Sequence, residues 1–372
     1  MKIKIAHVAG GLTTGGVEAV LYNYFSHMNK EDYELYYISY DKPNEEVKKR
    51  FENLGFHVYE VYKKKEHFFK SCMQVVKILK ENQIQIIHSH MTLVCFITSF
   101  LARLCGVKVA VAHSHLAQHI TGVKKYIYAV FKWLTKITSN YYIACGEEAA
   151  IYLYGKKKFE NGKVMLMHNA IDTEKFSYQE QIREQMRKEL AIDNCFCIGH
   201  VGRFTEQKNH LFLIDIFKEI VACKENAVLL LLGEGPLEEE VKEKVKALSL
   251  EKNVRFLGSS SEVYKYYQAM DVFLLPSLYE GLAVSLVEAQ CSGVPVVTAD
   301  TVTGEIRLAK AYEVLALTDS PESWAKAVCA YDEDRDAVLK ERKEAVKMIQ
   351  EAGYDIEKEA RKLDIFYKKI VR

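Results

Sequence analysis

The chain has 372 residues, of which 51 are Lys or Arg, 50 are Asp or Glu, and 49% are hydrophobic. At roughly 150 residues per domain, this length predicts two domains with sizeable cores. A charged fraction of 27%, with only 5 Pro and 19 Gly, excludes disordered, collagen-like and low-complexity chains. The net charge of +1 argues against a dedicated nucleic-acid binder, which usually carries a strong basic excess.

The near-neutral total hides two halves of opposite charge. Residues 1–175 contain 24 basic and 16 acidic side chains, whereas the remainder contains 27 and 34. This difference is either chance surface composition or a sign that the first half meets an anionic surface or substrate. On the sequence alone, both interpretations stay open.

The nine cysteines indicate a reducing compartment. No C-x-x-C pair occurs, and most cysteines lie in apolar surroundings, such as Val94-Cys95-Phe96. We therefore expect reduced core thiols and a cytoplasmic protein. The chain opens as a strand rather than as a secretory signal, and no uncharged apolar run reaches 18 residues. A membrane-spanning segment is therefore not expected.

In the first half, apolar runs of strand length alternate with stretches of helical spacing. Strands are expected at residues 3–9, 33–39, 57–61, 84–88, 107–113, 141–145 and 163–167. Helices are expected at residues 17–28, 45–54, 67–82, 92–105, 122–138 and 146–154. Strands that alternate with helices predict a parallel sheet covered on both faces.

A charged segment without a strand signal, residues 172–193, precedes a second series of the same kind. Strands are expected at residues 197–202, 227–233, 254–257, 272–276, 294–298 and 312–316. Helices are expected at residues 180–190, 210–223, 237–248, 261–269, 282–292, 321–351 and 355–371. The pattern predicts an α/β protein with two Rossmann-like, doubly wound domains facing across a cleft.

The first candidate site is the loop Gly10-Gly11-Leu-Thr-Thr-Gly15-Gly16, which follows the first strand. Glycines here let the backbone approach a ligand and direct helix N–H groups at a phosphate. The order is not G-x-G-x-x-G, and no Walker motif occurs, so a plain tight turn is the competing interpretation.

A second candidate loop, from Gly202 to Asn209, connects a strand to a helix in the second half. Arg203 offers a fork of donors and Lys208 a point charge, and the two could converge on a diphosphate. Two solvated surface cations are the alternative. The position between strand and helix favours the functional interpretation.

The third and strongest candidate contains two carboxylates eight residues apart, Glu280 and Glu288. If Gly281 opens the following helix, both lie on one helix face, and the helix N-terminus can hold an anion. Carboxylates at that spacing could each hold hydroxyl groups of one sugar ligand. A surface position for Glu288 is the alternative, and its apolar neighbours weaken it.

Together, these segments resemble the retaining GT-B glycosyltransferases of family 4, whose E-x7-E motif corresponds to Glu280 and Glu288. The resemblance covers essentially the whole chain and is nearest to the branch that builds bacterial capsule, exopolysaccharide or cell-wall glycans. The other matching motifs are Gly15-Gly16, His168-Asn169-Ala-Ile-Asp172, Gly202-Arg203…Lys208-Asn209 and Gly233-Glu-Gly-Pro236.

The resemblance implies that these residues bind a nucleotide sugar, with a UDP-sugar as the expected donor. Arg203 and Lys208 would bind the diphosphate and stabilise the leaving phosphate, Glu280 would contact the transferred sugar, and Glu288 would bind the ribose. The remaining donor-binding residues would be Gly15, Gly16, Asn169, Gly202, Glu234, Gly235, Gly281, Leu282 and Ala283.

The resemblance also implies how the domains divide the work. An N-terminal domain, residues 1–175, would bind a glycan or polyprenyl-linked acceptor, and a C-terminal domain, residues 176–350, would bind the donor. The last helix, within residues 351–372, would return to the N-terminal domain.

The implied reaction is hexosyl transfer with retention at the anomeric carbon, without a metal or other cofactor. No Asp-x-Asp lies near a strand end to hold a metal ion. Transfer on the front face, with the leaving phosphate assisting deprotonation of the acceptor, is the expectation for the family. The segment from Thr298 to Glu305 departs from the family's Gly-Gly-x-x-Glu run, although Glu305 is present.

Histidine pairs end two of the expected strands, as His88-Ser-His90 and His113-Ser-His115. Paired histidines suggest a metal site, but no Asp, Glu or Cys stands beside them. In the resembled family, a histidine of this region lies near the transferred sugar, which selects His113 first and His115 second. A strand-end histidine bonded to the backbone is the alternative.

Residues 121–136 combine four lysines with aromatic and apolar side chains at helical spacing. This pattern is typical of a helix on a membrane surface, and equally of an ordinary domain helix with lysines at its rim. With the basic first half, it is compatible with peripheral contact at the inner face of the membrane, where lipid-linked acceptors reside.

Two other functions compete with the transferase. One is a sugar-nucleotide epimerase of the same fold, which needs carboxylates placed for acid–base chemistry. The other is a non-catalytic partner subunit, which degenerate motifs would indicate. The spacing of Glu280 and Glu288 favours a transferase, and the presence of Arg203 and Lys208 argues against degeneration.

Overall fold

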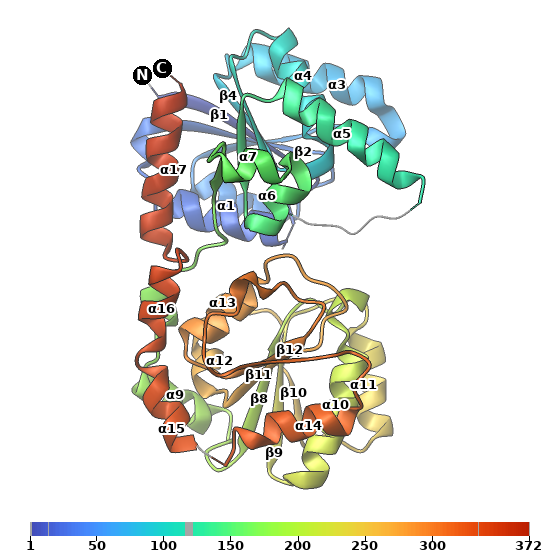
Figure 1. Cartoon of the computed structure of the whole chain (residues 1–372), viewed down its shortest axis with the longest axis vertical. Coiled ribbons are helices and arrows are strands. Elements are labelled where there is room, and N and C mark those ends of the chain that lie inside the picture. The colour runs from blue at the N-terminus through green and yellow to red at the C-terminus, as the bar shows by residue number, and fades with distance from the viewer. Residues whose placement is uncertain (1, 14, 116–121, 334, 372) are drawn as a thin grey trace. The chain divides into compact units, whose positions relative to one another are not determined.

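The computed structural model describes residues 2–13, 15–115, 122–333 and 335–371. It divides the chain into two compact units (Figure 1). The N-terminal unit comprises Met1–Ala170 together with Ile356–Arg372, and the C-terminal unit comprises Ile171–Asp355.

The expected boundaries, 175 and 350, are each displaced by five residues. Ile171 forms a parallel bridge with Asp355, and its N–H donates to the carbonyl of Tyr354 at 2.9 Å. The Thr173 hydroxyl donates to the Asp355 carboxylate at 2.6 Å in the interior. These contacts join the two ends of residues 171–355 within one unit.

The N-terminal unit is built on a parallel sheet, with seven strands among the described residues in the order β3-β2-β1-β4-β5-β6-β7. The strands are β1 (Ile3–Ala9), β2 (Tyr33–Ser39), β3 (Phe56–Glu60), β4 (Ile86–Ser89), β5 (Val109–Ser114), β6 (Tyr141–Ala144) and β7 (Val164–Leu166). The α-helices are α1 (Gly16–Ser26), α2 (Glu45–Asn53), α3 (Lys64–Glu81), α4 (Cys95–Leu104), α5 (Lys124–Thr138), α6 (Glu147–Tyr154), α7 (Lys156–Glu160) and α17 (Ile356–Ile370), and the 3-10 turns are η1 (Lys30–Asp32) and η2 (Thr92–Val94).

Side chains alternate along β1 and supply two cores, one on each face of this sheet. Ile5 lies in a core with α1, α2 and α17, whereas Ala6 and Val8 lie in a core with α3 and α4. Helix α17 is separated from the rest of its unit by the whole C-terminal unit in sequence, yet it contributes the fully buried Leu363 and Tyr367. Figure 1 shows α17 beside the N-terminal sheet, and α3, α4 and α5 grouped elsewhere on the same unit.

The C-terminal unit has a second parallel sheet, with six described strands in the order β10-β9-β8-β11-β12-β13. The strands are β8 (Phe196–Val201), β9 (Ala227–Leu232), β10 (Val254–Phe256), β11 (Val272–Leu275), β12 (Val296–Ala299) and β13 (Tyr312–Leu315). The α-helices are α8 (Thr173–Phe176), α9 (Glu180–Glu189), α10 (His210–Cys223), α11 (Glu238–Ala247), α12 (Val263–Ala269), α13 (Val284–Cys291), α14 (Pro321–Ala330), α15 (Arg335–Arg342) and α16 (Ala345–Glu351), and the 3-10 turns are η3 (Glu206–Lys208) and η4 (Gly304–Ile306). This confirms the expected class, α/β with two Rossmann-like parallel-sheet units.

Two helix predictions are wrong. The helix expected at 282–292 begins only at Val284. The helix expected at 321–351 is divided into α14, α15 and α16. At the end of α15, the buried guanidinium of Arg342 donates to the carbonyls of Ser292, Met270 and Tyr267, and this anchor ties the C-terminal segment to its own unit.

The cysteines are reduced, as the sequence predicts. Each of the nine cysteines is a free thiol. Within the described parts of the chain, no helix combines the length and the apolar character that crossing a membrane requires.

Candidate functional site

The charged candidate residues of the C-terminal unit lie on loops that follow neighbouring strands. Strand β8 is flanked by β9 and β11, so the direction in which the chain moves through the sheet reverses between β8 and β11. In open α/β sheets, this reversal leaves a crevice beyond the carboxyl ends of the strands, where ligands bind. The loops after β8, β9 and β11 therefore form the candidate site of this unit.

The loop after β8 is fixed to the turn after β9 by backbone hydrogen bonds. The Gly202 N–H donates to Leu232 O at 2.9 Å, and the Phe204 N–H donates to Glu234 O at 3.1 Å. Gly233 has φ of +137°, and a Cβ there would overlap the Gly202 carbonyl. A glycine is therefore required at this position to keep the two loops in contact.

Lys208 and Glu280 are brought together across the loops after β8 and β11. The Lys208 ammonium lies 2.6 Å from Glu280 Oε1, and the two side chains are only 16% and 7% exposed. Gln207 donates its amide to Glu280 Oε2 at 3.2 Å, and its backbone carbonyl accepts from Leu278 N–H at 2.8 Å. Both carboxylate oxygens of Glu280 are thus held in place by the neighbouring loop.

Arg203 differs from Lys208 in its surroundings. Its side chain is exposed, and it forms no ion pair with any residue that the structure describes. A guanidinium in this state can bind an incoming phosphate without first breaking a contact. The two cations are therefore not equivalent.

The expectation that Glu280 and Glu288 share one helix face is wrong. Helix α13 begins at Val284, so Glu280 lies in the loop before it and only Glu288 lies on the helix. One backbone hydrogen bond and the side chains of Gln207 and Asn209 hold residues 276–280 to the neighbouring loop, which keeps them non-helical. No side chain of the described residues caps the helix at Ala283, which leaves the N–H groups of Val284 and Ser285 for another acceptor, whereas the Leu286 N–H donates to the Ala283 carbonyl at 3.1 Å.

Glu288 is held by a tyrosine that the sequence did not reveal. The Tyr267 hydroxyl, on α12, donates to Glu288 Oε2 at 2.9 Å. Burial raises the pKa of Glu288 from 4.5 to about 7, and the hydrogen bond from Tyr267 opposes part of that rise. Near neutral pH, this carboxyl can therefore both accept and donate hydrogen bonds, as pairing with ribose hydroxyls requires.

Two further acids lie in the same unit. Glu234 Oε1 accepts from the Ser259 N–H at 3.4 Å, which places this side chain beside the turn after β10. Glu305 lies in η4, where the Thr303 side chain caps its N–H at 3.3 Å. Glu234 remains a predicted donor contact.

The glycine loop of the N-terminal unit opens on a small pocket of about 210 Å³. Gly15 is the N-cap of α1 and Gly16 its first residue. A Cβ at Gly15 would overlap the carboxylate of Glu18, which is buried and accepts from the Tyr37 hydroxyl at 3.1 Å. Arg50 also lines this pocket and adds a positive charge that the sequence motifs did not indicate.

The remaining N-terminal candidates lie at strand ends. Asn169 follows β7, next to His168, whose carbonyl accepts from the Tyr24 hydroxyl at 2.7 Å. His113 lies within β5 and its ring is fully buried, whereas His115, just beyond the strand, is partly exposed. Solvent access therefore favours His115 over His113 as the residue that could reach a bound sugar, the reverse of the predicted order.

The amphipathic segment forms α5, which begins at Lys124; Thr121 lies outside the described residues. Tyr126 is 75% exposed and Trp133 is 56% exposed, so its apolar face is turned to the surface rather than to the core.

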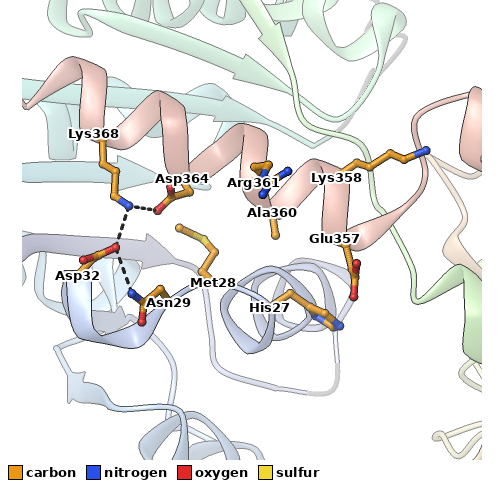
Figure 2. A pocket seen from close by; sticks show the side chains of 10 residues that line it. All are labelled: His27, Met28, Asn29, Asp32, Glu357, Lys358, Ala360, Arg361, Asp364 and Lys368. Atoms are coloured by element: carbon orange, nitrogen blue, oxygen red, sulfur yellow. Dashed lines mark hydrogen bonds and ion pairs between the residues drawn. The ribbon is translucent and has the colours of Figure 1, made fainter.

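The pocket in Figure 2, of about 500 Å³, contains none of the predicted site residues. It lies in the N-terminal unit between the end of α1 and α17. Lys368 donates to Asp32 at 2.7 Å and also pairs with Asp364 at 3.0 Å. These three charged groups thus satisfy one another, which fits a surface groove.

Each of the two units matches a known protein family. Residues 14–175 match the family described as Glycosyltransferase Family 4, and residues 181–353 match Glycosyl transferases group 1. The chain is 31% identical to EpsF of Bacillus subtilis over 87% of its own length and 86% of that protein. It is 28% identical, over 62% of each chain, to the Escherichia coli UDP-Gal:alpha-D-GlcNAc-diphosphoundecaprenol alpha-1,3-galactosyltransferase.

Among solved structures, Anabaena HepE in complex with UDP-glucose has the same fold. The TM-score is 0.81 at 17% identity, over 99% of this chain and the whole of HepE. The chain belongs to the family 4 glycosyltransferases, and each of its two units has a Rossmann-like parallel sheet of the kind found in GT-B enzymes.

Proposed function

We propose that this glycosyltransferase moves a hexose, with retention, from a UDP-sugar to a glycan or polyprenyl-linked acceptor in bacterial surface polysaccharide synthesis. The observation that carries the proposal is the Lys208–Glu280 pair beside Arg203 at the switch point of the C-terminal sheet. A UDP-sugar donor and a lipid-linked acceptor both occur in the name of the Escherichia coli relative, and HepE binds UDP-glucose.

Stabilisation of the leaving phosphate is the main catalytic task in this proposal. As the bond from the anomeric carbon to the diphosphate breaks, negative charge builds up on the phosphate oxygens. Arg203, Lys208 and the uncapped first turn of α13 supply positive charge and N–H donors to these phosphate oxygens. With these groups in place, the donor diphosphate needs no metal ion.

Glu280 would position the sugar while Lys208 binds the phosphate. In the structure, Lys208 and Gln207 hold the Glu280 carboxylate. A bound donor would draw the ammonium toward the phosphate and leave Glu280 free to accept hydrogen bonds from sugar hydroxyls. The short contact between the two side chains thus sets sugar and phosphate recognition side by side.

The other predicted donor contacts complete the binding site. Glu288 would bind the ribose, supported by Tyr267. Backbone groups at Gly281, Leu282 and Ala283 would hold the sugar and phosphate. Glu234 would lie near the nucleotide, and Gly15, Gly16 and Asn169 would approach the donor from the N-terminal unit, together with His113 or His115.

The direct test is nucleotide release from a panel of UDP-, GDP- and ADP-sugars, with and without a polyprenyl-diphosphate-linked saccharide. We expect release that depends on the acceptor and is restricted to a UDP-sugar. Isomerisation of the donor without release would favour the epimerase. Donor binding without turnover across a panel of lipid-linked acceptors would favour a non-catalytic partner subunit.

We further propose that α5 contacts the anionic inner face of the membrane. Its exposed apolar residues alternate with lysines, and its neighbours α3 and α4 add further exposed apolar side chains to the same unit (Figure 1). These residues are Val123, Tyr126, Ile127, Val130, Trp133 and Ile137 of the α5 region, Phe69 and Met73 of α3, and Phe100 and Leu104 of α4. Apolar side chains and lysines together match the chemistry of an anionic bilayer surface.

Vesicle sedimentation tests this surface. We expect the protein to bind phosphatidylglycerol vesicles more than phosphatidylcholine vesicles, and added salt to weaken the binding. Trp133→Ser should weaken it roughly tenfold, because an aromatic side chain no longer enters the bilayer. Ile365→Ser removes an apolar side chain that is 60% exposed on α17 and should have no effect. Equal binding to both lipids, or by both variants, would contradict the proposal.

A further inference from the structure

Five histidines gather at the carboxyl ends of β1, β4 and β5 in the described part of the N-terminal unit. Strand β4 lies between β1 and β5, with His7 directly opposite His88. Residues two apart on a strand share one face, so the two His-Ser-His pairs direct all four rings to the same side. The cluster consists of His7, His88, His90, His113 and His115.

The rings are joined by hydrogen bonds in two rows. In one row, His90 is bonded through Nε2 to His7 Nδ1 at 3.0 Å and through Nδ1 to His115 Nε2 at 2.9 Å. In the other row, His88 is bonded through Nε2 to His113 Nδ1 at 3.2 Å and through Nδ1 to the Tyr367 hydroxyl at 2.6 Å.

Each row ends on a buried ring nitrogen without a partner. His7 Nε2 and His113 Nε2 are both inaccessible to solvent and make no hydrogen bond in the described part of the chain. A buried polar nitrogen in this state is unfavourable. The arrangement is therefore incomplete as a hydrogen-bond network and can accommodate a further partner.

We propose that His90, His113 and His115 bind a divalent transition-metal ion of the Zn²⁺ type. One ring nitrogen from each lies within 4.8 Å of those of the other two. Ligand nitrogens of a tetrahedral zinc site lie about 3.3 Å apart, given bonds of about 2.0–2.1 Å. Small ring rotations would bring the three nitrogens to that spacing.

The other two histidines would support the ligands. Metal-bound imidazoles usually use their second nitrogen for a hydrogen bond that fixes the ring. His7 makes such a bond to His90, and His88 makes one to His113. His7, His88 and His90 form an alternative set, because one ring nitrogen from each also lies within 4.8 Å of those of the other two. We select the set with His115 because this residue is partly exposed, so an ion can enter there.

The chemistry of the set defines the ion. Imidazole nitrogens suit Zn²⁺, Co²⁺, Ni²⁺ or Cu²⁺, whereas Mg²⁺ and Ca²⁺ prefer oxygen ligands. Three ligands leave a fourth position for water or another group. The proposed transfer does not require the ion, because Arg203 and Lys208 neutralise the donor phosphate, but the site shares His113 and His115 with the proposed donor contacts.

Cobalt binding to the untagged, chelator-treated full chain tests the site. We expect one equivalent of Co²⁺ to bind with the visible absorption of four-coordinate cobalt, and Zn²⁺ to displace it. His115→Gln should weaken binding by at least about 100-fold, and His88→Gln by about 10–100-fold, because His88 only orients a ligand. The matched control is His57→Gln, at an exposed histidine of the same sheet, which should bind like the wild type.

Absence of the cobalt bands in the wild type would overturn the proposal, as would equal binding by His115→Gln and His57→Gln. The cluster would then be a neutral imidazole network. X-ray absorption of the zinc-loaded wild type gives a readout that needs no variant. Three imidazole ligands in that spectrum support the site, and ligation by oxygen alone contradicts it.

Discussion

Glu280 is the residue on which the proposed donor site depends most. Its carboxylate is nearly buried and is engaged at both oxygens by Lys208 and Gln207. Glu280→Gln keeps the shape of the side chain but removes the charge, and it leaves the Lys208 ammonium without its partner in a poorly hydrated place. We expect turnover to fall roughly 10²–10³-fold, as when one preorganised polar group is removed from an active site.

The measurement is acceptor-dependent nucleotide release at saturating donor. Glu239→Gln is the matched control, because Glu239 is exposed on α11 and pairs only with Lys242 on the surface. We expect this variant to retain wild-type turnover. If Glu280→Gln retained it as well, Glu280 would have no part in the reaction.

The raised pKa of Glu288 predicts how the free energy of unfolding depends on pH. Its pKa is about 7 in the folded chain and near 4.5 when exposed, so between these values the folded state holds a proton that the unfolded state has released. The free energy of unfolding therefore falls as pH rises from 4.5 to 7, by up to about 3 kcal/mol. Glu288→Gln removes the titrating carboxyl, and with it this loss of stability at higher pH. We expect the variant to gain stability relative to wild type at pH 8 and to match it more closely at pH 5.

Thermal unfolding of both proteins at the two pH values gives this comparison. The buried histidines are the same in wild type and variant, so their effect on stability cancels. The difference in stability between the two proteins therefore reports on Glu288. A stability difference of the same size at pH 5 and pH 8 would show that the Glu288 carboxyl is not shifted.

The sequence predicted the charged residues of the proposed donor site but not the polar groups that hold them. Arg203, Lys208 and Glu280 were selected by motif and by their loops between strand and helix. Gln207 lies in a candidate loop but was not singled out there, Tyr267 belongs to no motif, and their partners are 73 and 21 residues away. Only the folded chain brings such partners together.

At the scale of elements, the contact between the loops after β8 and β9 depends on glycines. A Cβ at Gly235 would overlap the backbone of Phe204, next to Arg203. Gly235→Ala should therefore lower the free energy of unfolding by about 1–3 kcal/mol, the usual cost of overpacking. Urea unfolding measures this change.

Gly304→Ala is the control for that substitution, because a Cβ at Gly304 meets no atom within 4 Å. It should change stability by less than about 0.5 kcal/mol. Equal effects of the two substitutions would mean that the loops do not need this close approach.

The sequence predicted most elements well because their patterns are local. Strands at 3–9 and 33–39 and the helix at 210–223 have the expected bounds. The start of α13 and the division into α14, α15 and α16 were missed, because both depend on distant contacts. Residues 276–280 are held by the loop after β8, and Arg342 is held by three carbonyls, two at the end of α12 and one just after α13.

At the scale of the whole molecule, the N-terminal unit is built from two segments that lie at opposite ends of the chain. The N-terminal unit takes its last helix from the end of the chain, and Leu363 and Tyr367 of that helix lie in its core. Tyr367 also meets His88, so the stability of α17 and the arrangement of the histidine cluster are coupled. The final helix therefore serves the unit in which the acceptor is proposed to bind.

The opposite charges of the two halves fit the division of work that we propose. The basic half carries α5 and the candidate membrane surface, whereas the acidic half carries Arg203 and Lys208 as local cations at the donor site. Net charge alone would place an anionic donor in the other half. The proposed donor site depends on a few fixed charges, and the proposed membrane surface on many exposed ones.

The most direct test of the central claim is the NMR spectrum of the product formed from an α-linked UDP-hexose and a polyprenyl-diphosphate-linked saccharide. The account predicts a new glycosidic bond with the transferred hexose still in the α configuration, together with an equivalent amount of UDP. A β-linked product would contradict retention. An isomerised UDP-sugar with no glycosidic product would contradict transfer itself.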